Sequence, residues 1–225
     1  MANNIVFCAY RKWAVDVFKD IQKQYCNKFD FYLVKNQLSL ESIITGGLEP
    51  EYIICIGWSW IIPTNITNKN KVVGIHPSDL PNYSGGSPLQ HQISEGLVNT
   101  KNTLFELNGE IDSGPILAKV DLSLGGTIDD VFNNLTKSST ELIKLLLDDK
   151  IKRTHLQKKH DIKRRKRLTE KDGELTTEKL LKMSAIDLYN FIRCRADPYP
   201  NAYLEDESGK LYFSSVYFRK GKNIK

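Results

Sequence analysis

The chain has 225 residues, enough for one large domain or for one domain with a small appendage. Its 40% hydrophobic and 26% charged residues exclude a disordered tail or a collagen-like chain. No apolar run approaches the roughly 20 residues that span a bilayer, and the opening MANNIVFCAY lacks the basic residues of a secretion signal. These features predict a globular, cytoplasmic protein.

Four cysteines are spread along the chain, at positions 8, 26, 55 and 194. None of them belongs to a CxxC pair, and Cys8 and Cys55 lie inside apolar runs. Such cysteines are typical of small buried side chains in a reducing compartment, rather than of zinc ligands or a disulfide framework. We therefore expect no metal site built on them.

The net charge of +5 is concentrated in one basic segment, residues 150–167. This segment holds ten lysines and arginines and a single acid, Asp161, so the rest of the chain is mildly negative. Three interpretations are open for it: a solvated linker, a phosphate-binding site for a nucleotide, or a patch for nucleic acid.

The first two thirds of the chain alternate between strands and helices. Thr127 is placed to cap the long helix predicted at residues 129–147. Near-continuous apolar strands separated by helices indicate a parallel sheet covered on both faces. Apolar runs predict strands at residues 4–10, 29–34, 52–58, 71–75 and 103–108, and helical periodicity predicts helices at residues 13–24, 87–95 and 129–147.

The residues after the basic segment have a different character. Ser184 and Asp187 form a capping-box pattern that opens a helix reaching Cys194. The sequence DPYPN then interrupts the chain, and residues 202–218 predict a β-hairpin around Ser208-Gly209. The predicted fold class is α/β: a Rossmann-like, mostly parallel twisted sheet with helices on both faces, plus a small C-terminal helix and β-hairpin appendage.

Two polar loops that follow predicted strands carry the candidate chemistry. One is HPSDLPNYSGGSPLQ, which begins with His76 and contains the pair Gly85 and Gly86. The other is NGEIDSGPIL, which places Asp112 between glycines. Each also has a structural interpretation, as a buried histidine, a tight glycine turn or a turn aspartate. Loops at adjacent strand ends would bring Asp112 beside His76, and a carboxylate beside an imidazole is the pairing that general acid–base catalysis uses.

At this point the sequence resembles a known family. HPSDLPNYSGGSP followed by NGEIDSGPIL resembles the signature of the formyltetrahydrofolate-dependent formyltransferases, HPSLLPxYRGxxP followed by a GxDxGxI loop, and IGWSWIIP resembles their folate-loop segment. The resemblance extends from about residue 4 to residue 147. AYRKWA, IKRRKRLTEKDGEL and FIRCRADPYPNAYL resemble segments of the members that act on sugar nucleotides. The resemblance implies a catalytic core at residues 1–150 and a basic connection with the small appendage at residues 151–225.

The implied reaction is transfer of a formyl group from N10-formyltetrahydrofolate to the amine of a nucleotide-linked amino-dideoxy sugar (dTDP or UDP), without a metal. His76 and Asp112 would be the catalytic residues, with the histidine stabilising the oxyanion or moving a proton. The implied folate contacts are Trp58, Ser59, Trp60, Ile61, Gly109, Glu110 and Ile111. The implied acceptor contacts are Tyr10, Arg11, Trp13, Ser84, Gly85, Gly86, Gln90, Arg164 and Arg165. Packing at a strand end is the alternative for the two tryptophans of the folate segment.

The chain departs from the family pattern at two positions. Gly74 stands where the family usually has the asparagine of an Asn-His-Asp triad, so the usual donor to the oxyanion is missing. Ser78, Asn82 and Gln90 lie near enough in the sequence to be substitutes. Ser84 stands where many relatives have arginine, which bears on contacts near the folate.

Other functions remain open from the sequence. Methionyl-tRNA is one alternative acceptor, for which the basic segment would be a phosphate patch, although relatives of that kind carry a larger domain after the core. A glycinamide-type purine precursor is another, and a folate- or nucleotide-binding protein that has lost catalysis is a third, motivated by Gly74. We expect no membrane or nucleic-acid partner, and a homodimer contact through aromatic residues of the hairpin segment: Tyr212, Phe213, Tyr217 and Phe218.

Overall fold

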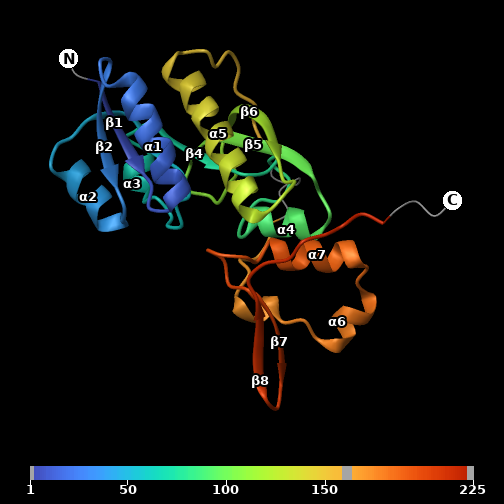
Figure 1. Ribbon diagram of the computed structural model, residues 1–225. Coiled ribbons are helices and arrows are strands. Elements are labelled where there is room, and N and C mark those ends of the chain that lie inside the picture. Colours follow the sequence, from blue (N-terminus) through green and yellow to red (C-terminus); the bar gives the residue numbers. More distant parts are fainter. Residues whose placement is uncertain (1–2, 159–163, 222–225) are drawn as a thin grey trace.

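The structure, a computed structural model, describes residues 3–158 and 164–221 (Figure 1). Residues 159–163 of the basic segment, with Asp161, lie outside the described residues. The strands are β1 (Asn3–Cys8), β2 (Phe29–Val34), β3 (Pro50–Cys55), β4 (Val72–His76), β5 (Asn99–Glu106), β6 (Ile116–Ser123), β7 (Ala202–Asp206) and β8 (Gly209–Phe213). The α-helices are α1 (Lys12–Tyr25), α2 (Gln37–Thr45), α3 (Thr64–Thr67), α4 (Pro88–Ser94), α5 (Ile128–Leu147), α6 (Thr177–Lys182) and α7 (Ala185–Arg193).

Six strands form one mixed sheet in the order β2-β1-β3-β4-β5-β6. The first four are parallel, as the apolar runs predicted, whereas β5 and β6 are antiparallel to their neighbours. The antiparallel direction of β5 has a consequence for the site. Because β5 ends beside Val73 rather than beside His76, the loop after β5 must fold back to reach the end of β4.

Helices cover both faces of this sheet, which confirms the predicted α/β class. On one face, Val17 and Ile21 of α1 and Leu142 of α5 pack against Ile5 and Phe7 of β1. The other face is covered by α2 and α3, and its apolar cluster is formed by Val6, Cys8, Val34, Leu40, Ile53, Cys55, Ile62, Ile66 and Val72. Burial on both faces explains why the central strands are apolar at successive positions rather than at alternate ones.

The predicted helix starts are confirmed by their capping contacts. The Thr127 hydroxyl accepts the N–H of Asp130, whose carboxylate accepts the N–H of Thr127 in return. Ser184 and Asp187 form the same reciprocal pair at the start of α7. Both pairs satisfy N–H groups that the first helical turn leaves without an intrahelical partner. The short elements α2, α3, α6 and the 3-10 turn Glu170–Gly173 were not predicted.

Two predicted strands are shorter than the sequence suggested. The strand predicted at residues 52–58 ends at Cys55, and the one at residues 4–10 ends at Cys8. The last ladder bond runs from the N–H of Ile56 to the carbonyl of Cys8, and Gly57 then turns the chain with a left-handed φ of +57°. Tyr10 and Trp58 consequently lie in loops at the carboxyl edge of the sheet.

The segment after the basic connection packs on the core with α7 beside α4 (Figure 1), and buried arginines fix it there. Arg193 of α7 donates to the carbonyls of Leu124 and Gly126 at 2.8 and 2.9 Å. Arg195 stacks on the ring of Phe191, with 3.8 Å from its guanidinium carbon to the ring centre. Burial lowers the pKa of both guanidinium groups. The hairpin β7–β8 confirms the predicted appendage, with its turn at Glu207-Ser208, one residue before the predicted one. The division at residue 150 stays a prediction.

All four cysteines are free thiols. Cys8, Cys55 and Cys194 are buried, as expected, but Cys26 is exposed because it follows the last turn of α1. Burial raises the pKa of the Cys8 and Cys194 thiols. Among the residues that the structure describes, no helix has both the length and the apolar character needed to cross a membrane.

Candidate active site

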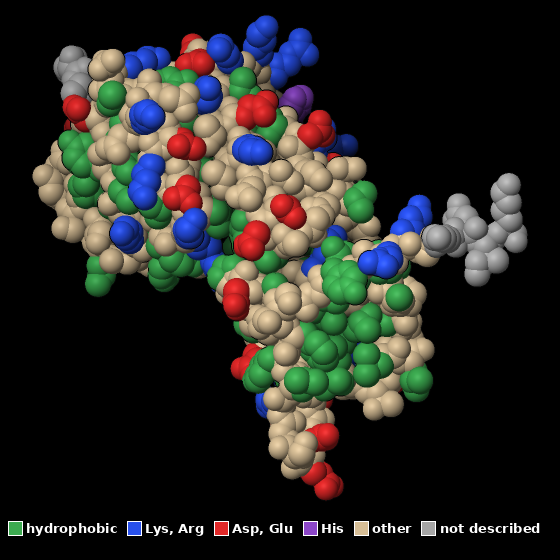
Figure 2. Space-filling model, viewed as in Figure 1, with side chains coloured by type: hydrophobic (Ala, Val, Ile, Leu, Met, Phe, Trp, Pro, Cys, Tyr) green, Lys and Arg blue, Asp and Glu red, His purple; other side chains and the backbone are tan. Residues whose placement is uncertain are grey.

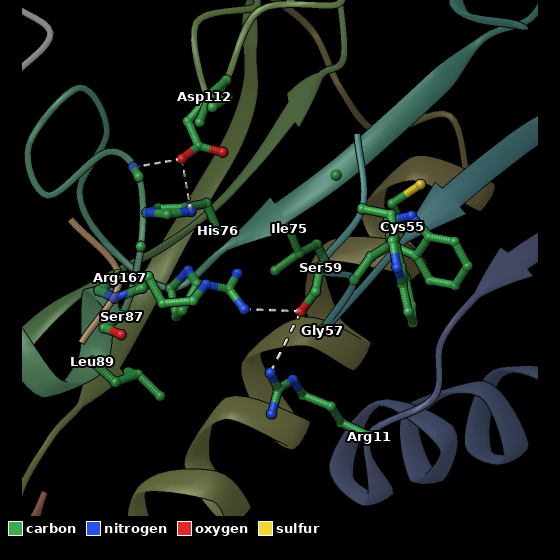
Figure 3. A pocket seen from close by; sticks show the side chains of 18 of the residues that line it. Arg11, Cys55, Gly57, Ser59, Ile75, His76, Ser87, Leu89, Asp112 and Arg167 are labelled. Atoms are coloured by element: carbon green, nitrogen blue, oxygen red, sulfur yellow. Dashed lines mark hydrogen bonds and ion pairs between the residues drawn. The ribbon is translucent and has the colours of Figure 1, made fainter. Parts of the chain in front are cut away.

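A cavity of about 660 Å³ lies beside the carboxyl ends of β1, β3 and β4 (Figure 3). The loops after these strands line it, together with the loop between β5 and β6, with residues 164, 165, 167 and 168, and with residues 198–200. The predicted site residues that line it are Arg11, Trp13, Trp58, Ser59, Trp60, Ile61, His76, Gly85, Gly86, Gln90, Gly109, Glu110, Ile111, Asp112, Arg164 and Arg165. The structure therefore brings most of the predicted residues into one cavity.

Two predicted site residues, Tyr10 and Ser84, do not line the cavity. The Tyr10 hydroxyl contacts Ser59 Oγ at 2.7 Å, so it supports a lining residue. Ser84 is fully buried, its Oγ has no hydrogen-bond partner, and its backbone carbonyl accepts the N–H of Arg165. Both residues therefore act on the cavity through the residues that they hold in place.

His76 and Asp112 lie together on the cavity wall (Figure 3). His76 Nδ1 is 3.5 Å from Asp112 Oδ2, which is longer than a tight hydrogen bond, and the His76 side chain is only 8% exposed. The other ring nitrogen, Nε2, is 2.9 Å from the carbonyl oxygen of Tyr83. A carbonyl only accepts, so Nε2 carries the hydrogen of that bond. A ring protonated at both nitrogens donates to both acceptors at once.

Asp112 is fixed by contacts other than the one to His76. Its Oδ2 accepts the backbone N–H of Gly85 at 2.7 Å, and its own carbonyl accepts the Gln157 amide at 3.0 Å. Its φ of +48° is left-handed, a conformation that aspartate adopts more readily than most residues. The Gln157 amide also donates to the Gly114 carbonyl at 2.8 Å, so it ties the Asp112 loop to the chain after α5.

Leu107 fills the space beside Gly74. A β-carbon on Gly74 would lie 2.6 Å from Leu107 Cδ1 and 3.2 Å from the ring of Phe105. The position where the family pattern has asparagine therefore faces apolar side chains, and Leu107 is a lining residue that sequence reasoning missed.

Of the three polar residues considered as substitutes for the missing asparagine, Gln90 alone lines the cavity. Ser78 is fully buried, and its hydroxyl donates to the carbonyl of Asn82 at 2.7 Å. Asn82 is exposed. The Gln90 side chain is 3% exposed and makes no hydrogen bond to the described residues, so its amide is free to meet a ligand.

The loop at residues 57–62 presents unused polar groups and aromatic rings. Its peptide groups make no backbone hydrogen bonds within the described residues. The Trp58 indole N–H is buried without a partner. Trp58 and Trp60 pack edge to face with ring centres 4.8 Å apart, and Tyr10 lies 4.9 Å from Trp60. Trp60 and Ile61 are 42% and 65% exposed, so packing of a strand end does not account for them.

The two glycines of the SGG turn make room for the basic segment. Gly85 pairs with Arg165 in a parallel bridge, in which Arg165 donates its N–H to the carbonyl of Ser84. A β-carbon on Gly85 would collide with the Arg165 carbonyl, and one on Gly86 would collide with the backbone of Arg167. The glycine pair therefore permits a close approach between two segments about eighty residues apart in sequence.

The arginines of residues 164–167 differ in their surroundings. Arg165 forms an ion pair with Glu95 at 3.0 Å, and its guanidinium stacks over Tyr83. Arg167, which was not predicted, points a terminal nitrogen at Ser59 Oγ, 3.4 Å away. Arg164 lines the cavity, and no ion pair to it is present among the described residues. Sequence reasoning missed Arg167 because nothing local distinguishes it from the other cations of the run.

Comparison with known proteins identifies the family of this chain. The fold and the cavity define an α/β protein with a cavity at the carboxyl edge of its sheet, where ligands of such sheets commonly bind. The sequence profile described as formyl transferase matches residues 19–144, more than half of the chain, so the chain belongs to the formyl transferase family.

Solved structures and curated sequences give further relatives. The methionyl-tRNA formyltransferase from Clostridium thermocellum is similar with a TM-score of 0.86 and 28% identity, covering 98% of this chain and 95% of that chain. A sugar N-formyltransferase from a Shewanella species has the same fold, with a TM-score of 0.74 and 16% identity, covering 97% and 99%. The curated methionyl-tRNA formyltransferase of Sulfurimonas denitrificans is 27% identical over 160 residues, 70% of this chain and 51% of that protein. The chain spans about half or less of the length of such curated relatives.

The residues that the structure describes contain no candidate metal site. No group of three or more histidine, cysteine, aspartate or glutamate side chains gathers there in a way that could hold an ion. The Asp112 carboxylate beside His76 already accepts a hydrogen bond from the Gly85 N–H. The polar groups that line the described cavity include the His76–Asp112 pair, the Glu110 carboxylate, serine hydroxyls and several guanidinium groups.

Proposed function

We propose that this chain is an N-formyltransferase that moves a formyl group from N10-formyltetrahydrofolate to the amine of a nucleotide-linked amino-dideoxy sugar (dTDP or UDP). The observation that carries the proposal is the His76–Asp112 pair on the wall of a cavity covered by residues 164–168. Membership of the formyl transferase family supports the group transferred. The cavity volume of about 660 Å³ supports small ligands, since such sites commonly range from about 300 to 1,000 Å³.

The loop at residues 57–62 is our proposed binding site for the folate. A pterin is a flat ring with donors and acceptors along its edge, and it needs polar groups that are not already used. The unpaired peptide groups of this loop and the buried, unpartnered indole N–H of Trp58 meet that need. Gly109, Glu110 and Ile111 line the cavity from the opposite loop and complete the proposed folate contacts.

In the proposed reaction, the neutral amine of the acceptor attacks the formyl carbon. A new C–N bond forms, the bond from the formyl carbon to N10 of the folate breaks, and one proton passes from the attacking nitrogen to N10. His76 donates from Nε2 to the oxygen on which negative charge develops, using the hydrogen that the Tyr83 carbonyl now accepts. Asp112 orients the ring through its contact with Nδ1.

Gln90 is our proposed second donor to the oxyanion, in place of the asparagine that the family pattern has at position 74. Its amide is unpaired and faces the same cavity as His76. The Gly74 position itself is closed by Leu107. The acceptor would lie against Arg11, Trp13, the Gly85-Gly86 turn, Arg164 and Arg165, with Tyr10 and Ser84 behind them.

The state of the basic segment favours a small acceptor over a polynucleotide. Lys150, Arg165 and Lys166 are paired with Asp148, Glu95 and Asp172, respectively. Their positive charge is therefore partly neutralised by the protein itself, whereas a nucleic-acid surface needs cations free to displace counterions from phosphates. A nucleotide diphosphate needs only two or three well-placed cations.

Methionyl-tRNA is the second candidate acceptor. The observation in its favour is the 28% identity to the methionyl-tRNA formyltransferase from Clostridium thermocellum over nearly the whole chain. The two acceptors differ in size and charge, so they make opposite predictions for competition. Bulk tRNA would inhibit formyl transfer in a salt-dependent way if it were the natural acceptor, and would be inert otherwise.

The test is an acceptor screen read by mass spectrometry. The purified chain is incubated with N10-formyltetrahydrofolate and, separately, with dTDP- and UDP-linked 3-amino and 4-amino dideoxy sugars, with methionyl-tRNA and with glycinamide ribonucleotide. We expect one formyl group to be added to at least one sugar nucleotide. Formylation of methionyl-tRNA or of glycinamide ribonucleotide alone would replace the proposed acceptor. Folate binding without transfer to any acceptor would indicate a protein that has lost catalysis.

Two further parts of the proposal concern the protein's surroundings. Four free thiols, three of them buried, support a cytoplasmic location.

Figure 2 shows hydrophobic side chains gathered over α6 and α7, where Leu181 and Ile186 are exposed. Tyr217 and Phe218 are exposed in the segment that follows the hairpin. The proposed homodimer contact runs through Tyr212, Tyr217 and Phe218, which are exposed, and leaves out Phe213, which packs against the C-terminal cluster.

A further inference from the structure

Two arginines from distant parts of the chain converge on one hydroxyl inside the cavity (Figure 3). Arg11 follows β1, and its Nη2 lies 3.5 Å from Ser59 Oγ. Arg167 lies beyond the basic connection, and its Nη1 lies 3.4 Å from the same atom. Like charges repel, so a fold that aims two guanidinium groups at one neutral oxygen gains stability from any anion placed between them.

This cluster contains donors in excess of acceptors. Guanidinium groups only donate, so the two arginines use both lone pairs of Ser59 Oγ. The Ser59 hydroxyl hydrogen then points to Tyr10 Oη, 2.7 Å away, which leaves the Tyr10 hydroxyl hydrogen free to donate elsewhere. The long contacts at 3.4 and 3.5 Å leave most of the guanidinium N–H groups without a partner. A ligand that supplies several acceptor oxygens would satisfy them.

The two arginines also differ from their basic neighbours in lacking an acid. Within residues 3–158 and 164–221, neither Arg11 nor Arg167 forms an ion pair, whereas Arg165 and Lys166 each do. Arg11 is also the N-cap of the 14-residue helix α1 and offers no side-chain cap, so the positive end of that helix dipole adds to the same region. Tyr199 lies close to both arginines, and its pKa of about 12 reflects desolvation that outweighs the two nearby cations.

We propose that Arg11, Ser59 and Arg167 form a phosphate subsite that binds a phosphate group of the acceptor and thereby joins residues 164–168 to the core. The assignment of the phosphate to the acceptor rests on the proposed function; the anion site itself does not. Phosphate fits better than a carboxylate because its several oxygens can accept from two guanidinium forks together. The glutamate tail of the folate is the other anion available to the reaction, and the experiment separates the two.

The experiment measures binding of inorganic pyrophosphate, dTDP and UDP by isothermal titration calorimetry at fixed ionic strength. The variants are Arg11→Gln and Arg167→Gln, which keep much of the side-chain length, and Arg153→Gln is the matched control because Arg153 is exposed and outside the cavity. We expect the dissociation constant to rise about tenfold or more in each site variant, as loss of a charge-assisted hydrogen bond predicts, and to stay unchanged in Arg153→Gln. Ser59→Ala should have a smaller effect than either arginine variant, because a neutral hydroxyl contributes less to anion binding than a charged guanidinium.

Three results would overturn the inference. Unchanged pyrophosphate and nucleotide binding in both arginine variants would show that no phosphate lies there. Weaker tetrahydrofolate binding with unchanged nucleotide binding would assign the arginines to the folate tail. Equal losses in Arg153→Gln would show a general effect of net charge. Thermal melts of each variant with and without pyrophosphate report folding, and Arg167→Lys, which keeps the charge but loses the planar fork, replaces Arg167→Gln if that variant unfolds.

The acceptor screen and this experiment can fail independently. Loss of pyrophosphate binding in the arginine variants, together with no formyl transfer to any sugar nucleotide, would retain the anion subsite and reject the proposed acceptor. If the chain formylates a sugar nucleotide and Arg167→Gln leaves the KM for that nucleotide unchanged, the proposed acceptor is retained and the anion subsite is rejected.

Discussion

Leu107 occupies the space beside Gly74, with its Cδ1 2.6 Å from where a β-carbon on Gly74 would lie. The two residues are therefore matched: the glycine leaves room, and the leucine fills it. A side chain at position 74 can enter only if Leu107 moves, which bears directly on how the family asparagine could be restored.

We expect Gly74→Asn alone to destabilise the fold by about 1–3 kcal/mol, as overpacking does, and to reduce formyl transfer. Gly74→Asn combined with Leu107→Ala should be more stable than the two single changes predict together, by a coupling energy of about 0.5–3 kcal/mol. Urea unfolding of the four proteins measures this coupling. Strictly additive effects would show that Leu107 does not limit what position 74 accepts.

The second prediction concerns the imidazole–carboxylate pair. His76→Ala and Asp112→Asn should each lower kcat by at least about 100-fold while the fold stays intact, because the roles that we propose for them are chemical. Asp121→Asn is a suitable control, since Asp121 pairs with Lys101 at the protein surface. Wild-type turnover in either site variant, with correct folding by circular dichroism, would remove that residue from the mechanism.

Gln90 gives the third prediction. Gln90→Ala should lower kcat by about 100-fold if its amide donates to the oxyanion, while KM for the folate changes little, since the contact strengthens only in the transition state. Gln92→Ala serves as a comparison, because the neighbouring Gln92 donates to the carbonyls of Pro77 and Pro88 and holds the turn instead. A rise in KM with unchanged kcat would make Gln90 a binding residue only.

The fourth prediction tests Arg164 and Arg165. Replacing both with alanine should raise KM for the sugar nucleotide more than KM for the folate, because both line the cavity and Arg165 also holds the SGG turn through Glu95 and Tyr83. Filter binding of bulk tRNA, measured for the wild type and for the same double variant, tests the alternative that tRNA is the acceptor. Tight, steeply salt-dependent tRNA binding that the double change abolishes would favour the tRNA acceptor.

Tyr199 makes stability depend on pH at the alkaline end. Burial raises its pKa from 10.0 in a model compound to about 12 in the fold. The folded state therefore keeps the phenol neutral while the unfolded chain ionises, so stability is complete below pH 10 and declines as the pH rises toward 12. Tyr199→Phe should lose less stability than wild type across that interval. Parallel curves of unfolding free energy against pH for the two proteins would contradict this.

Much of the architecture follows from the sequence because its causes are local. The strands predicted at residues 29–34 and 71–75 match β2 and β4 closely, since a run of apolar residues needs burial on both faces wherever it lies. The capping boxes at Thr127 and Ser184 were equally predictable, because each is complete within four residues. The sequence also indicated that His76 and Asp112 would meet.

The tertiary structure decided how they meet and what surrounds them. β5 runs antiparallel to β4, so Asp112 reaches His76 by a loop that folds back, not by lying at a neighbouring strand end. The pairing of Gly85 with Arg165 and the convergence of Arg11 and Arg167 on Ser59 join segments far apart in the chain. Composition and periodicity describe a residue's neighbours along the chain, whereas these contacts depend on which distant backbone passes within a few ångströms, and that is fixed only when the whole sheet and the appendage have packed.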